Sequence, residues 1–210
     1  MLYMMFVKFF TIYLKRHDLK IIGLENLPKK GPYLVAANHA SYLDHIVTSW
    51  IVATHTKNKV KYLAKKEHFE GTFQKWWHEN LVNAIPIDRD AGGKEALETA
   101  VKELKKGAII GIYPEGTRTL TGKMQKAKTG IARLVLEAKV PVLPIGLRGT
   151  FKVLPKGKNI PKKGKIEASI GKLIYFNDYY KKRVTKKLLR QITNKVMKEI
   201  AKLAKQKYEY

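Results

Sequence analysis

The sequence predicts an α/β domain in which helices flank a central, mostly parallel or mixed sheet, with an amphipathic helix at the N-terminus. Short β-rich runs alternate with helical patterns along the chain. Most of these runs are continuously apolar, as strands covered on both faces require. The length of 210 residues and the 45% hydrophobic content suit one domain with a substantial core.

The elements can be assigned in order along the chain. Strands are predicted at 20–24, 33–37, 60–63, 84–87, 108–113 and 142–147, with another around 166–174. Helices are predicted at 43–53, 69–81, 94–106 and 130–137. Residues 151–165 are rich in Pro, Gly and Lys, which predicts a basic surface loop. Residues 181–207 keep apolar side chains at helical spacing among many lysines, which predicts a basic C-terminal helix.

The N-terminal segment 2–14 is almost entirely apolar and is interrupted only by Lys8 and Thr11. As a helix it is about 20 Å long, shorter than the roughly 30 Å hydrocarbon core of a bilayer. Lys8, Thr11 and Lys15 form a polar stripe opposite Phe6, Phe9, Phe10 and Tyr13. This pattern predicts a helix lying in a membrane interface, and the alternative is a helix packed on the core of its own domain. We therefore divide the chain into a membrane-interface helix at 1–19 and a domain at 20–210.

The charge balance is unusual, because 42 Lys and Arg residues oppose 17 Asp and Glu residues for a formal net charge of +25. Such an excess indicates an anionic partner, such as nucleic acid, anionic lipid, a phosphorylated substrate or an acidic carrier protein. The chain contains no cysteine. This excludes disulfides, thiolate metal sites and a cysteine nucleophile, so any catalysis uses hydroxyl, imidazole, carboxylate or cationic groups.

The first polar motif, NHASYLD, follows the predicted strand 33–37 and contains His39 and Asp44. On one continuous helix these two residues would point about 140° apart. They meet only if His39 lies in the turn and Asp44 in the first turn of the helix. Ser41 is a natural N-cap for this helix, with Asp44 near the capping-box position. Taken alone, the motif is explained more simply by a capping aspartate and a hydrogen-bonded loop histidine than by a catalytic pair.

A second motif, YPEGTRT, follows the predicted strand 108–113. Its proline ends the strand, and Gly116 permits a tight backbone turn. Glu115 and Arg118 bracket this turn, where a guanidinium fork can hold a phosphate, although a local Glu–Arg pair is the simpler interpretation. Two further blocks are IPIDR, in which a strand ends at Arg89, and the proline-punctuated strand VPVLPI at 140–145.

Together, these four blocks resemble the lysophosphatidic acid acyltransferase family (1-acyl-sn-glycerol-3-phosphate acyltransferases) from about Leu24 to Gly171. The resemblance implies transfer of a fatty acyl group from acyl-CoA or acyl carrier protein to the sn-2 hydroxyl of 1-acylglycerol-3-phosphate. The product would be phosphatidic acid. It also implies that no cofactor and no metal take part.

The resemblance assigns roles to particular residues. His39 would be the general base and Asp44 would hold its ring. The family positions associated with glycerol phosphate correspond to Arg89, Glu115, Gly116, Thr117, Arg118 and Lys128. The sequence departs from the family pattern at Asn83, where glycine is usual, and at Ala127, where an aromatic residue often precedes the lysine.

Several alternatives stay open at this point. A different acceptor within the same family is one alternative, for example glycerol-3-phosphate or another lysolipid. A basic nucleic-acid-binding protein would explain the charge, but the basic residues are scattered and no nucleic-acid-binding signature is present. A lipid or ester hydrolase could use the same histidine and phosphate-binding turn to activate water, but no G-x-S-x-G motif occurs. We expect the partners to be lysophosphatidate, an anionic bilayer surface and the acyl donor, with no nucleic acid. We also expect a monotopic membrane location on the cytoplasmic face.

Overall fold

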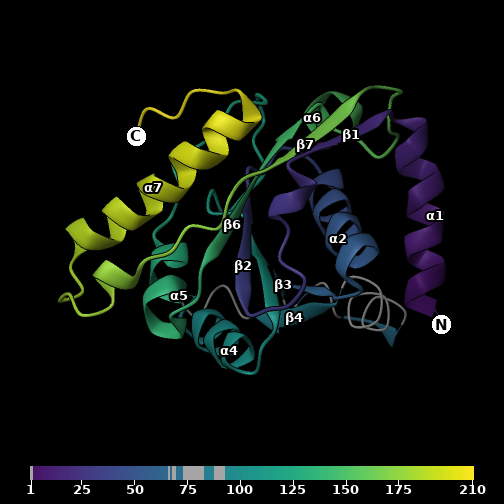
Figure 1. Ribbon diagram of the computed structural model, residues 1–210. Coiled ribbons are helices and arrows are strands. Elements are labelled where there is room, and N and C mark those ends of the chain that lie inside the picture. The colour runs from purple at the N-terminus through teal and green to yellow at the C-terminus, as the bar shows by residue number, and fades with distance from the viewer. Residues whose placement is uncertain (1, 66, 68–69, 73–82, 88–92) are drawn as a thin grey trace.

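A computed structural model describes residues 2–65, 67, 70–72, 83–87 and 93–210 and contains one seven-stranded sheet (Figure 1). The strand order is β1-β7-β6-β2-β5-β3-β4, and every neighbouring pair is parallel except β6–β7. The strands are β1 (Leu19–Ile22), β2 (Tyr33–Ala37), β3 (Val60–Lys65), β4 (Ala84–Ile87), β5 (Ile109–Ile112), β6 (Val142–Arg148) and β7 (Ile166–Ile170). The predicted α/β class is confirmed.

Helices cover both faces of the sheet, which explains the continuous apolar runs in the strands. On one face lie α4 (Lys94–Lys105), α5 (Gly130–Ala138) and α7 (Lys186–Ala204), and on the other lie α1 (Leu2–Arg16) and α2 (Leu43–Thr56). In β2, Leu34 and Ala36 pack into the core beneath the first group, and Tyr33 and Val35 pack beneath the second. All five β2 residues are buried, so each face of the strand needs apolar side chains.

The observed elements differ from the predicted ones in a few places. The loop predicted at 151–165 begins inside a short helix, α6 (Thr150–Val153). The strand predicted around 166–174 ends at Ile170. Short 3-10 helices occur at Leu24–Asn26 and Asn177–Tyr179. Nearly all of the helix predicted at 69–81 lies outside the described residues, as does Arg89.

The N-terminal helix α1 packs one side on the domain and exposes the other. Val7 and Leu14 are buried, and Thr11 accepts a hydrogen bond from Trp50 Nε1 of α2 at 2.8 Å. The predicted polar stripe was therefore wrong at Thr11, which faces the protein because the indole N–H of Trp50 takes its hydroxyl as an acceptor. The exposed side carries both Phe9 and Ile12, together with lysines and Arg16.

Within the described ranges, no helix has both the length and the apolar character needed to cross a bilayer. The interfacial position of α1 and the division of the chain at residue 20 stay predictions of the sequence.

The topology brings two loops together at one edge of the sheet. β2 lies between β5 and β6 and runs parallel to both, so the carboxyl ends of these three strands meet at the same edge. The turn after β2 contains His39, and the loop after β5 contains the YPEGTRT motif. In open α/β sheets this edge is where binding sites form.

Candidate active site

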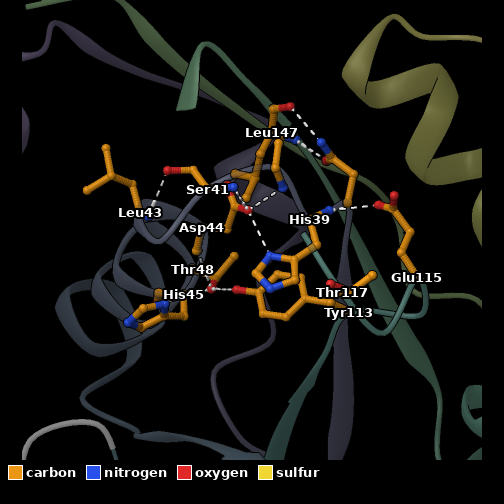
Figure 2. A network of polar contacts seen from close by, with 12 residues as sticks. His39, Ser41, Leu43, Asp44, His45, Thr48, Tyr113, Glu115, Thr117 and Leu147 are labelled. Atoms are coloured by element: carbon orange, nitrogen blue, oxygen red, sulfur yellow. Dashed lines mark hydrogen bonds and ion pairs between the residues drawn. The ribbon is translucent and has the colours of Figure 1, made fainter. Parts of the chain in front are cut away.

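The turn that carries His39 is fixed to β6 by the side chain of Asn38. The Asn38 amide donates to the Leu147 carbonyl oxygen at 3.0 Å, and its own oxygen accepts from the Leu147 N–H at 2.7 Å (Figure 2). This pairing continues the strand contacts of β2 and β6 by one residue beyond Ala37. The sequence offered one signal for this role, a polar amide placed directly after a fully buried strand, but the motif alone assigned Asn38 no function.

His39 and Asp44 are in direct contact across this turn. His39 Nδ1 lies 2.9 Å from Asp44 Oδ2, and the Asp44 side chain is completely buried. The same carboxylate oxygen accepts from the backbone N–H groups of Ala40 at 2.6 Å and Ser41 at 2.7 Å. Asp44 therefore organises the turn and contacts the histidine through one atom, so the two interpretations left open by the sequence describe the same contact. The other carboxylate oxygen, Oδ1, is buried without a hydrogen-bond partner in the described structure.

Ser41 does not cap α2 in the predicted way. The helix begins at Leu43, and Tyr42 occupies the N-cap position without a side-chain cap. The Ser41 hydroxyl accepts from the Leu43 N–H at 3.0 Å and donates to the Leu154 carbonyl oxygen at 2.6 Å. The prediction failed because Ser41 lies one residue too early and its hydroxyl also links the turn to α6.

The imidazole of His39 is stacked against Tyr113, the first residue after β5. The ring centroids lie 4.0 Å apart, and the ring planes are inclined by 14°. The Tyr113 hydroxyl is 3.3 Å from the Thr48 hydroxyl of α2, and burial raises the pKa of Tyr113 well above its ordinary value. A neutral phenol ring thus supports one face of the imidazole. His39 retains 18% side-chain exposure, and Nε2 has no hydrogen-bond partner among the described residues.

The carboxyl group of Glu115 joins the turn after β2 to the loop after β5. Its Oε1 accepts from the His39 backbone N–H at 2.8 Å, and its Oε2 accepts from the Gln125 backbone N–H at 2.7 Å. A further bond runs from the Thr119 N–H to the His39 carbonyl oxygen at 3.0 Å. Glu115 is only 3% exposed, and burial raises its pKa from an ordinary 4.5 to about 7, against the lowering effect of these hydrogen bonds. Glu115 is not paired with Arg118, so the simpler interpretation of the motif as a local ion pair was wrong.

The remaining residues of the second motif form a basic turn beside His39. Gly116 adopts φ = +77°, and a Cβ there would lie 3.2 Å from the aliphatic part of the exposed Lys128 side chain. The Arg118 guanidinium lies 3.3 Å from the centroid of the Tyr42 ring, and its Nη1 atom is buried without a hydrogen-bond partner in the described structure. Thr117 is exposed. The structure therefore places three of the predicted phosphate-site residues, Gly116, Thr117 and Arg118, in one turn with the Lys128 side chain beside it, and Arg89 lies outside the described residues.

Side chains near the C-terminus form hydrogen bonds with the backbone of the loop that follows the second motif. The sequence did not indicate these contacts. The Tyr208 hydroxyl accepts from the Ala127 N–H at 3.2 Å, and Gln206 Oε1 accepts from the Met124 N–H at 3.1 Å. Arg190 of α7 donates to the Ala127 carbonyl oxygen at 2.8 Å. Ala127 was a departure from the family pattern, and here its backbone is bonded on both sides by residues from the end of the chain.

The second departure also has a structural explanation. Asn83 has φ = +53°, a left-handed conformation that asparagine tolerates better than most residues other than glycine. Its side chain donates to the Val60 carbonyl oxygen at 3.3 Å. Asparagine at this position thus keeps the backbone conformation that a glycine would allow.

The described residues contain no group of three or more His, Cys, Asp or Glu side chains arranged to hold a metal ion. The polar groups at the site are one imidazole backed by a carboxylate, and a turn that carries Arg118 with Lys128 beside it. This arrangement can remove a proton from a hydroxyl group and hold an anion next to it.

Comparisons with known proteins agree with this arrangement. Residues 18–148 match the Acyltransferase protein family. The chain is 31% identical over 166 residues to a 1-acyl-sn-glycerol-3-phosphate acyltransferase of Bacillus subtilis, covering 78% of this chain and 77% of that protein. It is also 31% identical over 163 residues to a chloroplast 1-acyl-sn-glycerol-3-phosphate acyltransferase of Arabidopsis thaliana, covering 76% of this chain but only 44% of that longer protein.

A solved structure supports the same relationship. The crystal structure of a 1-acyl-sn-glycerophosphate acyltransferase from Thermotoga maritima superposes with a TM-score of 0.75 at 28% sequence identity, covering 98% of this chain and 79% of that one. By sequence and by fold, this chain belongs to the acyltransferase family.

Proposed function

We propose that this enzyme transfers a fatty acyl group from a thioester donor to the sn-2 hydroxyl of 1-acylglycerol-3-phosphate, giving phosphatidic acid. The observation that carries the proposal is the 2.9 Å contact between His39 Nδ1 and Asp44 Oδ2, next to the loop that bears Arg118. The names of the relatives from Bacillus subtilis and Arabidopsis thaliana support this choice of acceptor.

In the proposed mechanism His39 acts as the general base. Its Nδ1–H donates to Asp44, which leaves the lone pair of Nε2 free to take the proton of the acceptor hydroxyl. The hydroxyl oxygen attacks the thioester carbonyl carbon, and the tetrahedral intermediate collapses with cleavage of the C–S bond. The imidazolium returns its proton to the departing thiolate. This is the histidine–carboxylate part of a hydrolase triad, with the substrate hydroxyl in place of the serine.

Asp44 favours this chemistry in two ways. Its contact with Nδ1 selects the tautomer in which Nε2 accepts, and its negative charge stabilises the imidazolium that forms during attack. Because the same oxygen is held by two backbone N–H groups, the carboxylate is fixed before the substrate binds. Stacking on Tyr113 restricts the remaining rotation of the imidazole ring.

We assign the phosphate of the acceptor to the basic turn at residues 116–118, with Lys128 beside it. Arg118 Nη1 is buried and has no partner among the described residues, and a phosphate oxygen would satisfy it. The Tyr42 ring holds the guanidinium in place by a cation–π contact. Glu115 serves this site indirectly, because its carboxyl group is directed to the backbones of His39 and Gln125. Arg89 stays a predicted contributor.

The donor is either acyl-CoA or acyl carrier protein. Both are anionic, and the net charge of +25 favours binding of an anionic donor. We also propose that the enzyme works at a membrane surface, since its acceptor is a lipid and α1 exposes Phe9 and Ile12 beside lysines. The cytoplasmic face stays a prediction.

The proposal can be tested by measuring thiol release with a panel of acceptors and with each of the two thioester donors. We expect thiol release to depend on lysophosphatidate and to be weak with glycerol-3-phosphate, a phosphate-free monoacylglycerol or no acceptor. Comparable thiol release without any acceptor would indicate a hydrolase instead. A preference for glycerol-3-phosphate would assign a different acceptor within the same family.

A further inference from the structure

We propose that the lysine-rich loop 155–165, between α6 and β7, docks on an anionic bilayer and inserts its tip, Ile160, beside the mouth of the active site. The proposal builds on the proposed function in one respect, namely that the lipid acceptor reaches His39 from a bilayer. The contact itself is a property of the loop and can be measured without catalysis. For brevity we name residues 155–165 the docking loop.

The composition of the docking loop matches a lipid surface. It contains five lysines and no acidic residue. Its tip, Ile160, is 83% exposed, more than any other large hydrophobic side chain in the described part of the chain. Lys158, Lys162 and Lys163 make no ion pair with any described residue. Their ammonium groups are therefore free to reach lipid phosphates while their aliphatic stems lie along the acyl boundary.

The docking loop has a defined backbone course. The Lys158 N–H donates to the Pro155 carbonyl oxygen at 3.2 Å, and the Lys162 N–H donates to the Val153 carbonyl oxygen at 2.8 Å. The second bond folds the far side of the loop back onto α6, so residues 156–161 form a closed projection with Ile160 near its end. A pre-formed projection loses less conformational entropy on binding than a disordered segment does.

The first end of the docking loop touches both functional turns. Pro155 forms an antiparallel bridge with Ser41, two residues from His39. The Lys156 ammonium lies 3.5 Å from the Thr117 hydroxyl in the basic turn. A second exposed aliphatic side chain, Leu120, follows in the same loop as Thr117. A bilayer in contact with the docking loop would thus lie close to the position proposed for the acceptor phosphate.

The second end of the docking loop is fastened to the turn between α1 and β1. The Ile166 N–H donates to the His17 carbonyl oxygen at 3.2 Å, and Lys165 lies 3.8 Å from Asp18. Figure 1 shows α6, the start of β7 and the C-terminal end of α1 on the same side of the molecule. In this proposal the bilayer also contacts the exposed Phe9 and Ile12 of α1, and two separate contacts would fix the orientation of the enzyme on the bilayer.

An acidic carrier protein is an alternative anionic partner for the docking loop. The combination of lysines with an exposed aliphatic side chain favours the bilayer instead. Lysines are depleted in protein–protein interfaces, whereas a bare aliphatic tip between lysines is typical of segments that lie at the headgroup boundary. Each lysine near an anionic membrane surface strengthens binding roughly fivefold, and the effect disappears on a neutral surface.

Vesicle sedimentation of the full chain without any acyl donor tests the proposal. The vesicles are phosphatidylcholine alone or phosphatidylcholine mixed with phosphatidylglycerol. We expect Ile160→Asp to lower the partition to the mixed vesicles about tenfold, with an unchanged Tm because Ile160 is exposed. Replacing Lys158, Lys162 and Lys163 by glutamine is expected to reduce binding to the mixed vesicles and to leave the weak binding to pure phosphatidylcholine unchanged.

Val184→Asp is the matched control. Val184 is 56% exposed and follows Lys181, Lys182 and Arg183, so its surroundings are chemically similar. It precedes α7, and Figure 1 shows α7 on the opposite side of the molecule from α1. We expect Val184→Asp to bind vesicles as the wild type does.

Three results would overturn the proposal: no wild-type binding to mixed vesicles, wild-type partition of Ile160→Asp, or an equal loss for Val184→Asp. Normal partition of Ile160→Asp with slower turnover only from the carrier-protein donor would show that the loop docks a protein. A wild-type chain that binds vesicles through Ile160 but transfers no acyl group would refute the proposed function and leave the docking loop supported.

Discussion

The backbone N–H of His39 donates to the buried carboxyl group of Glu115 at 2.8 Å. This bond joins the turn after β2 to the loop after β5, and the Thr119 N–H to His39 carbonyl bond reinforces it. The proposed base and the proposed phosphate site thus share one hydrogen-bonded frame. Their relative position depends on Glu115, whose charge depends in turn on pH.

Glu115 should make stability fall as pH rises toward neutrality. Burial raises its pKa from 4.5 to about 7, so between these values the folded chain holds a proton that the unfolded chain has lost. Its contribution is fully present below about pH 4.5 and is lost as pH rises through about 7, up to about 3 kcal/mol in total. Urea unfolding of the wild type and Glu115→Gln at pH 5 and pH 7.5 measures this. A pH-independent difference between the two proteins would contradict the assignment.

Asp44→Asn should lower kcat much more than it raises KM. The amide oxygen can still accept the Ala40 and Ser41 N–H bonds, but the charge that stabilises the imidazolium is lost. We expect a loss of about 10²-fold or more in kcat with a small change in Tm. Steady-state kinetics with lysophosphatidate provide the measurement. A raised KM at unchanged kcat would make Asp44 a residue of binding or of turn structure only.

Arg118→Ala should act mainly on the phosphate-bearing acceptor. Loss of a charge-assisted hydrogen bond costs about 1.5–3 kcal/mol, so kcat/KM for lysophosphatidate should fall about 10- to 100-fold. Residual transfer to a phosphate-free monoacylglycerol should hardly change. Arg133→Ala, on the exposed side of α5, is the control for loss of a positive charge. An equal loss of kcat/KM with both acceptors would show that Arg118 does not bind the phosphate.

Tyr208→Phe should loosen the loop that carries Lys128. It removes the hydroxyl that accepts from the Ala127 N–H, which costs about 1 kcal/mol of stability. Because the loop positions the phosphate site, KM for lysophosphatidate should rise more than kcat falls. Tyr210→Phe is the control, since the Tyr210 side chain is exposed and its interaction with Asn194 uses the backbone oxygen. An unchanged KM in Tyr208→Phe would show that the contact is structural only.

The sheet could be predicted well from sequence because its central strands are buried on both faces. β2 was predicted at its observed bounds, since every position from Tyr33 to Ala37 must be apolar or small. Short elements gave weaker signals. The four-residue helix α6 has no complete amphipathic pattern, and its residues were assigned in part to the basic loop that follows.

From the sequence, only those contacts of the site that join residues close together in the chain could be predicted. The spacing of His39 and Asp44 required a turn followed by a helix, which the structure contains. Contacts between distant segments left no local pattern: Glu115 bonding to the His39 backbone, Asn38 pairing with Leu147, and Tyr208 supporting Ala127. Thr11 was misassigned for the same reason, because its partner Trp50 lies on another helix.

The most direct test of the account is the turnover of His39→Ala, measured as thiol release in the presence and absence of lysophosphatidate. If His39 is the general base, acceptor-dependent release should fall by about 10² to 10⁴ while Tm stays close to that of the wild type. His55→Ala, at an exposed histidine of α2, should retain wild-type turnover. Acceptor-dependent release by His39→Ala at a rate close to that of the wild type would contradict the mechanism.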